Sequence, residues 1–283
     1  MLIQPSQMGV ALLADIAAAE PGEGLVVWWL GQSGFLVKST LGRVLFDPYL
    51  SDSLTKKYQS TDKPHVRMTQ LALQPDKLRG IDLITSTHNH TDHLDAETLG
   101  PLLAGNPNAS LLIPEANRDF VAQRLDCSVD WPTGISDGES LTIGEITIHA
   151  VPAAHNEIER DSHRRSKYLG YVVQLGEMTV YHSGDTLRYP GMSEYLRDFR
   201  VDLAILPING NRNERGVAGN LFGDEAAQLA HDMRAKVVIP CHYNMFRFNT
   251  ESPDLFVDTC RLLGQPYRVP QCGERVEVSP ADR

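Results

Sequence analysis

Four potential metal ligands lie within six residues of this sequence, directly after a run of apolar residues. They are His88, His90, Asp92 and His93. The preceding run, residues 81–87, is short and rich in β-branched and aliphatic side chains, which predicts a buried strand. Imidazole and carboxylate groups bind zinc, or manganese and iron where oxygen ligands are more numerous. The stretch therefore predicts a metal site where a strand ends; the alternative is a solvated polar loop.

The spacing of these residues indicates two ions. In extended backbone, residues two apart point to the same side, so His88 and His90 can reach a single ion. Asp92 and His93 come after the chain bends and can point toward a second ion. A cluster of this kind that opens from a buried strand is typical of a functional metal centre.

Three later residues, each just past a predicted strand, complete a known pattern: His155, Asp185 and His242. Together with the first cluster, they resemble the signature of the metallo-β-lactamase fold superfamily. Within that superfamily the chain most resembles the L-ascorbate-6-phosphate lactonase-like branch, and the similarity extends over about residues 25–278. The segments that carry the similarity to this branch are residues 28–34, 181–185 and 235–240.

The resemblance implies a fold and a metal centre. The implied fold is α/β (α+β), a four-layer αββα sandwich of two mixed β-sheets flanked by helices. The implied cofactors are two divalent metal ions, zinc or manganese, with iron as a further candidate. Asp185 would bridge the two ions. The other implied ligands are His88, His90 and His155 for one ion, and Asp92, His93 and His242 for the other.

The same resemblance implies a metal-dependent hydrolase that uses a metal-bound hydroxide. Asp92 is the implied catalytic residue, because it would both bind a metal ion and orient the attacking water. The leading hypothesis is the opening of a lactone of a sugar acid, phosphorylated or not. The alternatives are a phosphodiesterase acting on a cyclic nucleotide, a phospholipid or an RNA end, a di-iron redox protein, and a metal-stabilised binding protein without turnover.

A second informative stretch, residues 208–216, follows a buried strand and is rich in Asn, Arg and Gly. Guanidinium groups bind phosphate or carboxylate, and Asn side chains bind sugar hydroxyls, so a small anionic substrate is expected. An ordinary solvated loop is the alternative. The candidate substrate contacts, from this stretch, from the approach to the next helix and from the residues after the last His, are Asn209, Arg212, Arg215, Asn220, Tyr243 and Asn244.

The hydrophobic pattern indicates hairpins, then a strand and helix, then hairpins, then strands and helices again. This order suggests two mixed sheets with helices outside. We predict a single domain over residues 1–283, with an N-terminal helical extension over about residues 1–22. The predicted strands are residues 25–30, 35–39, 43–47, 81–87, 111–114, 140–143, 146–151, 168–175, 178–182, 202–207 and 236–240. The predicted helices are residues 7–19, 96–103, 117–125, 224–233 and 252–263, the last with Ser252 as its N-cap.

Two further features each have two interpretations. Asp47, which ends a strand before Pro48, either supports the metal site or only terminates the strand. Residues 50–80, in which Lys56, Lys57, His65 and Arg67 give local positive charge, form either a lid or a plain surface excursion. His182 is expected to be a core or supporting residue, not a ligand.

The composition limits the function classes. The net charge is −10, from 36 acidic and 26 basic residues, which disfavours broad nucleic-acid binding or binding to anionic membranes. The four cysteines form no C-x-x-C pair, which is typical of a reduced, cytoplasmic protein. No apolar run of about 18 residues predicts a membrane span. The apolar N-terminal helix and the pair Trp28–Trp29 leave room for a homo-oligomer interface.

Overall fold

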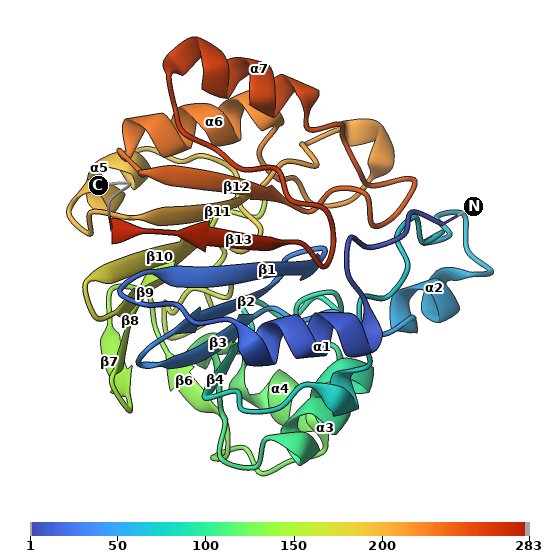
Figure 1. Cartoon of the computed structure of the whole chain (residues 1–283). Helices are drawn as coiled ribbons and strands as arrows, with labels where there is room; N and C mark the ends of the chain where they lie inside the picture. The colour runs from blue at the N-terminus through green and yellow to red at the C-terminus, as the bar shows by residue number, and fades with distance from the viewer. Residues whose placement is uncertain (1, 281–283) are drawn as a thin grey trace.

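The computed structural model describes residues 2–280 as two mixed β-sheets packed face to face, with helices on both outer faces (Figure 1). This arrangement confirms the predicted four-layer αββα sandwich. One sheet is covered by α5 (Met192–Arg197), α6 (Gly223–Asp232) and α7 (Asp254–Leu263). The other is covered by α1 (Gly9–Ala18), α3 (Ala96–Gly105) and α4 (Arg118–Leu125). The remaining helical segments are α2 (Ser53–Tyr58) and the 3₁₀ turns η1 (Pro75–Lys77), η2 (Glu115–Asn117) and η3 (Asn213–Arg215).

The seven-stranded sheet begins with the predicted meander. Its first three strands pair antiparallel in succession, and the next three continue the sheet in parallel. The last strand of the chain returns to pair antiparallel with the first. In spatial order the strands are β13 (Arg275–Val278), β1 (Leu25–Gly31), β2 (Gly34–Ser39), β3 (Gly42–Phe46), β4 (Leu83–Thr85), β5 (Ser110–Pro114) and β6 (Thr133–Ile135).

The six-stranded sheet contains both predicted hairpins, and two parallel strands follow them. In spatial order its strands are β12 (Val237–Cys241), β11 (Leu203–Pro207), β10 (Met178–His182), β9 (Leu169–Leu175), β8 (Ile146–Pro152) and β7 (Ser140–Ile143). β10, β11 and β12 are parallel, and β8 runs the same way because β8 and β10 are both antiparallel to β9. The chain segments that leave β8, β10 and β12 therefore emerge at one edge of the sheet.

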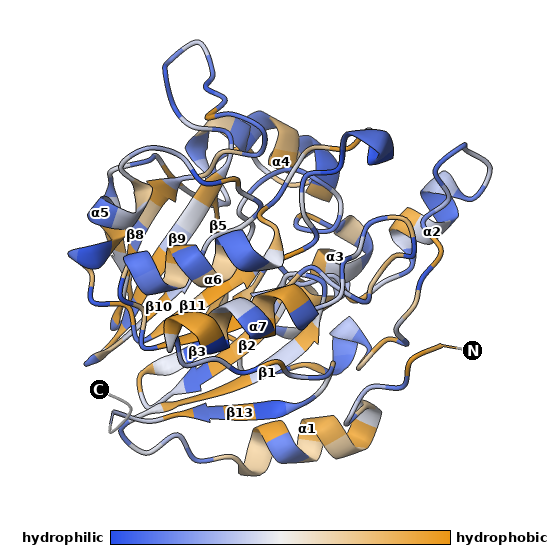
Figure 2. Ribbon diagram, turned by 90° about the horizontal axis from the view of Figure 1, so that it is seen from above, coloured by the Kyte–Doolittle hydropathy of each residue, from blue (hydrophilic) through white to orange (hydrophobic). Residues whose placement is uncertain are grey.

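The core lies between the sheets and beneath the helices. Every residue of β1, β10, β11 and β12 is buried, as expected for strands covered on both faces. Figure 2 shows the hydrophobic residues concentrated in the strands, whereas the surrounding loops are mostly hydrophilic. No helix within residues 2–280 is both long and apolar enough to cross a membrane.

The N-terminal helix packs on the domain instead of extending away from it. Leu12 and Ile16 of α1 are buried in the main core. Asp15 accepts a 2.7 Å hydrogen bond from the indole nitrogen of Trp28, which fixes the helix to β1. Trp28 and Trp29 are both buried, so they offer no surface to another subunit, contrary to the expectation from sequence. At the other end of the chain, α7 begins at Asp254, with Pro253 and not Ser252 at its N-cap position.

Candidate metal centre

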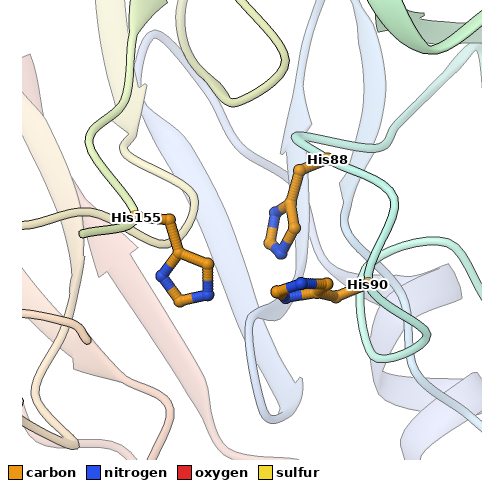
Figure 3. Close-up of side chains that lie close together, drawn as sticks. All are labelled: His88, His90 and His155. Atoms are coloured by element: carbon orange, nitrogen blue, oxygen red, sulfur yellow. The ribbon is translucent and has the colours of Figure 1, made fainter. Parts of the chain in front are cut away.

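Figure 3 shows three imidazole rings that point toward one another from two separate segments of the chain. His88 and His90 lie in the loop after β4, and His155 follows β8 in the opposite sheet. One ligand nitrogen from each of the three residues can be chosen so that all lie within 4.8 Å of one another. This spacing is suitable for a single metal ion, and we call the three residues the first group.

A second group of ligand atoms adjoins the first. Atoms of Asp92, His93 and His242 also lie within 4.8 Å of one another. Asp185, after β10, lies between the groups: its Oδ2 is 3.7 Å from His155 Nε2 and 3.5 Å from His242 Nε2. Its Oδ1 is 3.3 Å from His93 Nε2. The structure thus brings together all seven residues that the sequence predicted as ligands, with Asp185 where a bridging carboxylate would be needed.

The donor atoms of this cluster fit a metal ion. The Nε2 atom of His88 is buried and makes no hydrogen bond, and the buried His93 Nε2 and Asp185 Oδ1 make none beyond their 3.3 Å contact with each other. A buried polar atom without a partner costs about 1–3 kcal/mol, so such atoms are rare unless a ligand satisfies them. Imidazole nitrogen with carboxylate oxygen suits zinc, and the two carboxylates also suit manganese or iron. The residues present therefore match the two divalent ions that the resemblance implies.

Neighbouring groups orient the ligand rings. Asp47 Oδ2 lies 2.7 Å from His93 Nδ1, and Gly219 O lies 2.9 Å from His155 Nδ1. Both contacts favour the tautomer with hydrogen on Nδ1 and leave Nε2 free for a metal ion. Asp47 is fully buried and also accepts hydrogen bonds from Thr85 Oγ1 at 2.9 Å and from Thr87 N at 3.1 Å. Of its two interpretations, the structure favours the supporting role at the metal site.

The two groups differ in their electrostatics. Burial lowers the pKa of His88, His90 and His155, so the imidazoles of the first group are neutral, the form that binds metal. Burial also opposes charge on His93 and His242, but carboxylates outweigh it: Asp185 and Asp92 raise the pKa of His93 well above its usual value and that of His242 to about 9.

The carboxylates of the cluster are ionised. Burial opposes the charge on Asp92 and Asp185, yet nearby histidines, above all His93, hold the pKa of both groups well below the usual range. In the second group, a metal ion therefore competes with protons for His93 and His242. The first group presents no such competition, since its imidazoles are already neutral.

Residues with left-handed backbone surround the centre. Gln32 has φ +52°, Asp47 +36°, His242 +61° and Asn244 +54°. Such conformations are uncommon outside glycine, and they recur where a functional site fixes the backbone. His182, by contrast, is a core residue with both ring nitrogens in use, since Nε2 lies 2.9 Å from Ser33 O and Nδ1 accepts from Gly184 N at 3.2 Å.

The cluster opens onto a cleft of about 530 Å³, which five of its seven ligands, all but His88 and His93, help to line. Residues of the 51–69 segment line one wall of this cleft, namely Leu54, Lys57, Tyr58, Lys63 and His65. The imidazole of His65 stacks on Tyr58 at 4.3 Å and meets Phe248 edge-on at 4.6 Å. The segment is therefore part of the site and not a plain surface excursion.

Of the six predicted substrate contacts, only Asn220 is among the residues that line the cleft in the described part of the chain. Arg212 and Arg215 share Glu251 as an ion-pair partner, so their guanidinium groups are directed to that carboxylate and not to the cleft. Asn209 donates to Asn249 at 2.9 Å, and the hydroxyl of Tyr243 donates to Pro270 O at 2.6 Å. The backbone nitrogen of Asn244 donates to Thr250 Oγ1 at 2.8 Å. Sequence reasoning did not identify Glu251 as the partner of these arginines, because it lies far from both along the chain.

Sequence reasoning also missed Arg124, which lines the cleft from α4. Its Nη1 donates to the carbonyl oxygens of Asn89 and Leu94, at 2.7 and 3.2 Å, and so supports the loop that carries the ligands. Its guanidinium also lies 4.4 Å from the ring centroid of Phe120. No local pattern marks an arginine in a helix as a partner of a loop some thirty residues away.

The chain is similar to known proteins over nearly its whole length. The family model of the β-lactamase superfamily domain matches residues 42–243. A UPF0173 metal-dependent hydrolase from Myxococcus xanthus is 30% identical over 279 residues, which cover 94% of this chain and 86% of that protein.

Two solved structures share the fold. A metallo hydrolase from the archaeon Ignicoccus hospitalis has 22% identity and a TM-score of 0.64, covering 89% of this chain and 97% of its own. An isothiocyanate hydrolase from Delia radicum gut bacteria has 17% identity and a TM-score of 0.69, covering 90% and 99%. With the sandwich and the ligand cluster in place, the match over residues 42–243 and the Myxococcus relative identify the family. The chain therefore belongs to the β-lactamase superfamily, among its metal-dependent hydrolases.

Proposed function

We propose that this protein hydrolyses a small anionic ester with two divalent metal ions, most directly a lactone of a sugar acid. The observation that carries the proposal is the cluster of seven ligands beside an open cleft. Several of its metal-ligand atoms are buried and make no hydrogen bond. His88, His90 and His155 would hold one ion. Asp92, His93 and His242 would hold the other, and Asp185 would bridge them.

Ions at this position supply Lewis-acid polarisation of a substrate oxygen and lower the pKa of water toward 7. The residues of the chain do the rest. Asp92 lines the cleft, and its side chain is 16% exposed, so it can accept a hydrogen bond from the attacking water and orient it. Its depressed pKa keeps it a carboxylate, as both ligation and orientation require.

The charge of the cleft wall supports an anionic substrate. Lys57 and Lys63 line the cleft, and neither forms an ion pair with a carboxylate in the described part of the chain. Lys63 Nζ donates only to the carbonyl of Gly216, at 2.9 Å, and Lys57 lies over the ring of Tyr58. An ammonium group without an acidic partner attracts a carboxylate or phosphate. These two lysines, instead of Arg212 and Arg215, are the proposed contacts of the anionic group.

The proposal extends to the cellular environment of the protein and to its kind of partner. All four cysteines are free thiols, which supports a reducing, cytoplasmic environment. The acidic net charge supports a small-molecule substrate over a broad nucleic-acid partner.

The test is hydrolysis of a panel of lactones and of bis-p-nitrophenyl phosphate, before and after chelation and after manganese or zinc is restored. We expect chelator-sensitive lactone opening that Asp92→Asn abolishes and the surface variant Asp76→Asn retains. Lys57→Met with Lys63→Met should raise KM about tenfold for an anionic lactone and leave KM for a neutral lactone unchanged, with Lys77→Met as the matched control. Phosphodiester cleavage without lactone opening would favour the phosphodiesterase hypothesis over the lactonase hypothesis. No activity with either metal ion would refute the proposal that the protein is a hydrolase.

A further inference from the structure

Gln32 reaches from the turn between β1 and β2 into the second group of ligands. Its side chain is buried, with the residue 1% exposed. Its Nε2 atom lies 2.7 Å from Asp92 Oδ2 and 2.9 Å from His242 Nε2. Asp92 Oδ2 and His242 Nε2 are 3.4 Å apart. The end of the Gln32 side chain therefore lies directly beside two ligand atoms of the second group.

The backbone holds Gln32 firmly in this place. Its carbonyl oxygen accepts hydrogen bonds from His242 N at 3.1 Å and from the indole of Trp29 at 2.9 Å. The turn that carries Gln32 is thus joined directly to the last histidine of the cluster. Its left-handed φ of +52° is a conformation that glutamine rarely adopts, and these contacts maintain it.

The other end of the amide has no partner. Gln32 Oε1 is buried and makes no hydrogen bond, which is costly for an amide oxygen. The two ends of a glutamine amide differ little in shape, and a half-turn about the last side-chain bond exchanges them. After that turn, the oxygen would lie about 2.7–2.9 Å from Asp92 Oδ2 and His242 Nε2. Adjacent ligands of one ion with bonds of about 2.1 Å at right angles are separated by about 3 Å.

We propose that Gln32 is a further ligand of the second metal ion, which it binds through Oε1 with the amide turned over from the orientation in the structure. The inference rests on the proposed two-metal site. It would give the unpartnered oxygen an ion to bind. It would also make the second site richer in oxygen than the first, since Asp92 and Gln32 offer oxygen there alone and the bridging Asp185 serves both sites, whereas His88, His90 and His155 offer nitrogen. Oxygen ligands favour manganese or iron over zinc.

The test is a calorimetric titration of chelator-treated protein with MnCl₂, in which the two equivalents are resolved. Gln32→Leu removes the ligand at nearly constant volume, and Gln32→Glu replaces the amide oxygen with a carboxylate oxygen. The exposed Gln123→Leu, in α4, is the matched control. We expect Gln32→Leu to weaken one of the two equivalents at least tenfold and leave the other unchanged. Gln32→Glu should bind that same equivalent at least as tightly as the unaltered protein.

Each other result overturns the inference. If Gln32→Glu weakens that equivalent as much as Gln32→Leu, the amide acts only as a hydrogen-bond donor to Asp92. If Gln32→Leu binds more tightly, the amide competes with the metal ion. If neither variant differs from Gln123→Leu, Gln32 is not a ligand. If the unaltered protein binds one equivalent, the two-metal site on which the inference rests is refuted. Lactone and phosphodiester assays on the same unaltered protein report separately whether the proposed hydrolase activity holds.

Discussion

At the residue scale, the centre depends on groups that hold its ligands as much as on the ligands themselves. Asp47 is the clearest case, because one buried carboxylate contacts His93, Thr85 and Thr87. Its oxygen near His93 Nδ1 favours the proton on that nitrogen, which leaves Nε2 free to bind a metal ion. A residue with this role affects metal affinity without touching the metal.

Asp47→Asn should therefore weaken metal binding by about 10- to 100-fold, because an amide contacts His93 Nδ1 less strongly than a carboxylate does. Asparagine tolerates the left-handed backbone at this position, so the variant should still fold. Calorimetric titration with zinc or manganese measures the change. Asp76→Asn, which alters a surface ion pair with Lys77, is the control. Equal affinities in the two variants would show that Asp47 only ends its strand.

His155→Ala should reduce the bound metal from about two ions per chain to about one, since it removes one of three ligands from the first group and none from the second. Elemental analysis of purified protein measures this content. His163→Ala, in an exposed loop, should leave it unchanged. Loss of both ions in His155→Ala would mean that the two groups do not bind independently.

The sequence was sufficient to identify the seven clustered residues, because ligand type and spacing are local patterns and each ligand follows an apolar strand. It was not sufficient to identify the cleft wall. Arg212 and Arg215 had the right chemistry for an anion, but both pair with Glu251 and neither lines the cleft. Lys57 and Lys63 line the cleft because the 51–69 segment forms one of its walls. This is a feature of the tertiary structure that no local sequence pattern indicates.

At the element scale, the side chain of Arg67 links the two ends of the 51–69 segment. Its guanidinium pairs with Asp52 at 2.6 Å and also donates to Ser51 O. It reaches outside the segment to Met245 Sδ at 3.1 Å and lies 5.4 Å from the ring centroid of Tyr49. The Arg67 side chain is only 8% exposed, but that of Asp52 is 48% exposed, so water screens their ion pair. Together with backbone hydrogen bonds such as the one from Met68 N to Met245 O, Arg67 holds the wall of the cleft on the domain.

Arg67→Ala should cost about 1–3 kcal/mol of unfolding free energy, because it leaves the carbonyl oxygen of the buried Ser51 without its charged partner. Amide hydrogen exchange should accelerate within residues 51–69 and stay unchanged in β10, β11 and β12. Mass spectrometry of exchange in peptides measures both regions. Arg268→Ala, at an exposed arginine that donates to the carbonyl of its neighbour, is the control. Uniform acceleration over the whole chain would indicate global destabilisation and refute a local anchor.

The elements that sequence predicted well have strong patterns. The meander β1–β3 and the hairpins β7–β8 and β9–β10 combine apolar strands with short turns, and all three form as expected. β6 and α5 were not predicted. β6 has three residues with a central glycine and α5 has six residues of mixed polarity, so neither shows a recognisable hydrophobic periodicity. The N-cap of α7 was misplaced by one residue, within the usual uncertainty of helix ends.

At the scale of the whole molecule, the metal cluster joins the two sheets. Its ligands follow β4 in one sheet and β8, β10 and β12 in the other. Ions bound there connect the two halves of the sandwich and stabilise only the folded state. Without them, only contacts among the ligands and with groups such as Asp47 and Gln32 hold the cluster together.

Chelation should therefore lower the melting temperature. An ion present at about 1,000 times its dissociation constant contributes about 4 kcal/mol, which corresponds to roughly 10 °C for a domain of this size. Thermal unfolding with and without EDTA, followed by readdition of manganese or zinc, measures the effect. A melting temperature that neither treatment changes would contradict metal binding by the cluster.

The order of the ligands along the chain has a consequence for biosynthesis. All three residues of the first group have been synthesised by His155, but the second group is incomplete until His242, near the end of the chain. At about 5–20 residues per second, a ribosome needs several seconds more to reach it. β10, β11 and β12 are synthesised only during that interval, so their part of the sheet is still incomplete. The nascent chain is thus exposed to cellular metal while it holds five of its seven ligands, and a complete second group can form only after His242 has been synthesised.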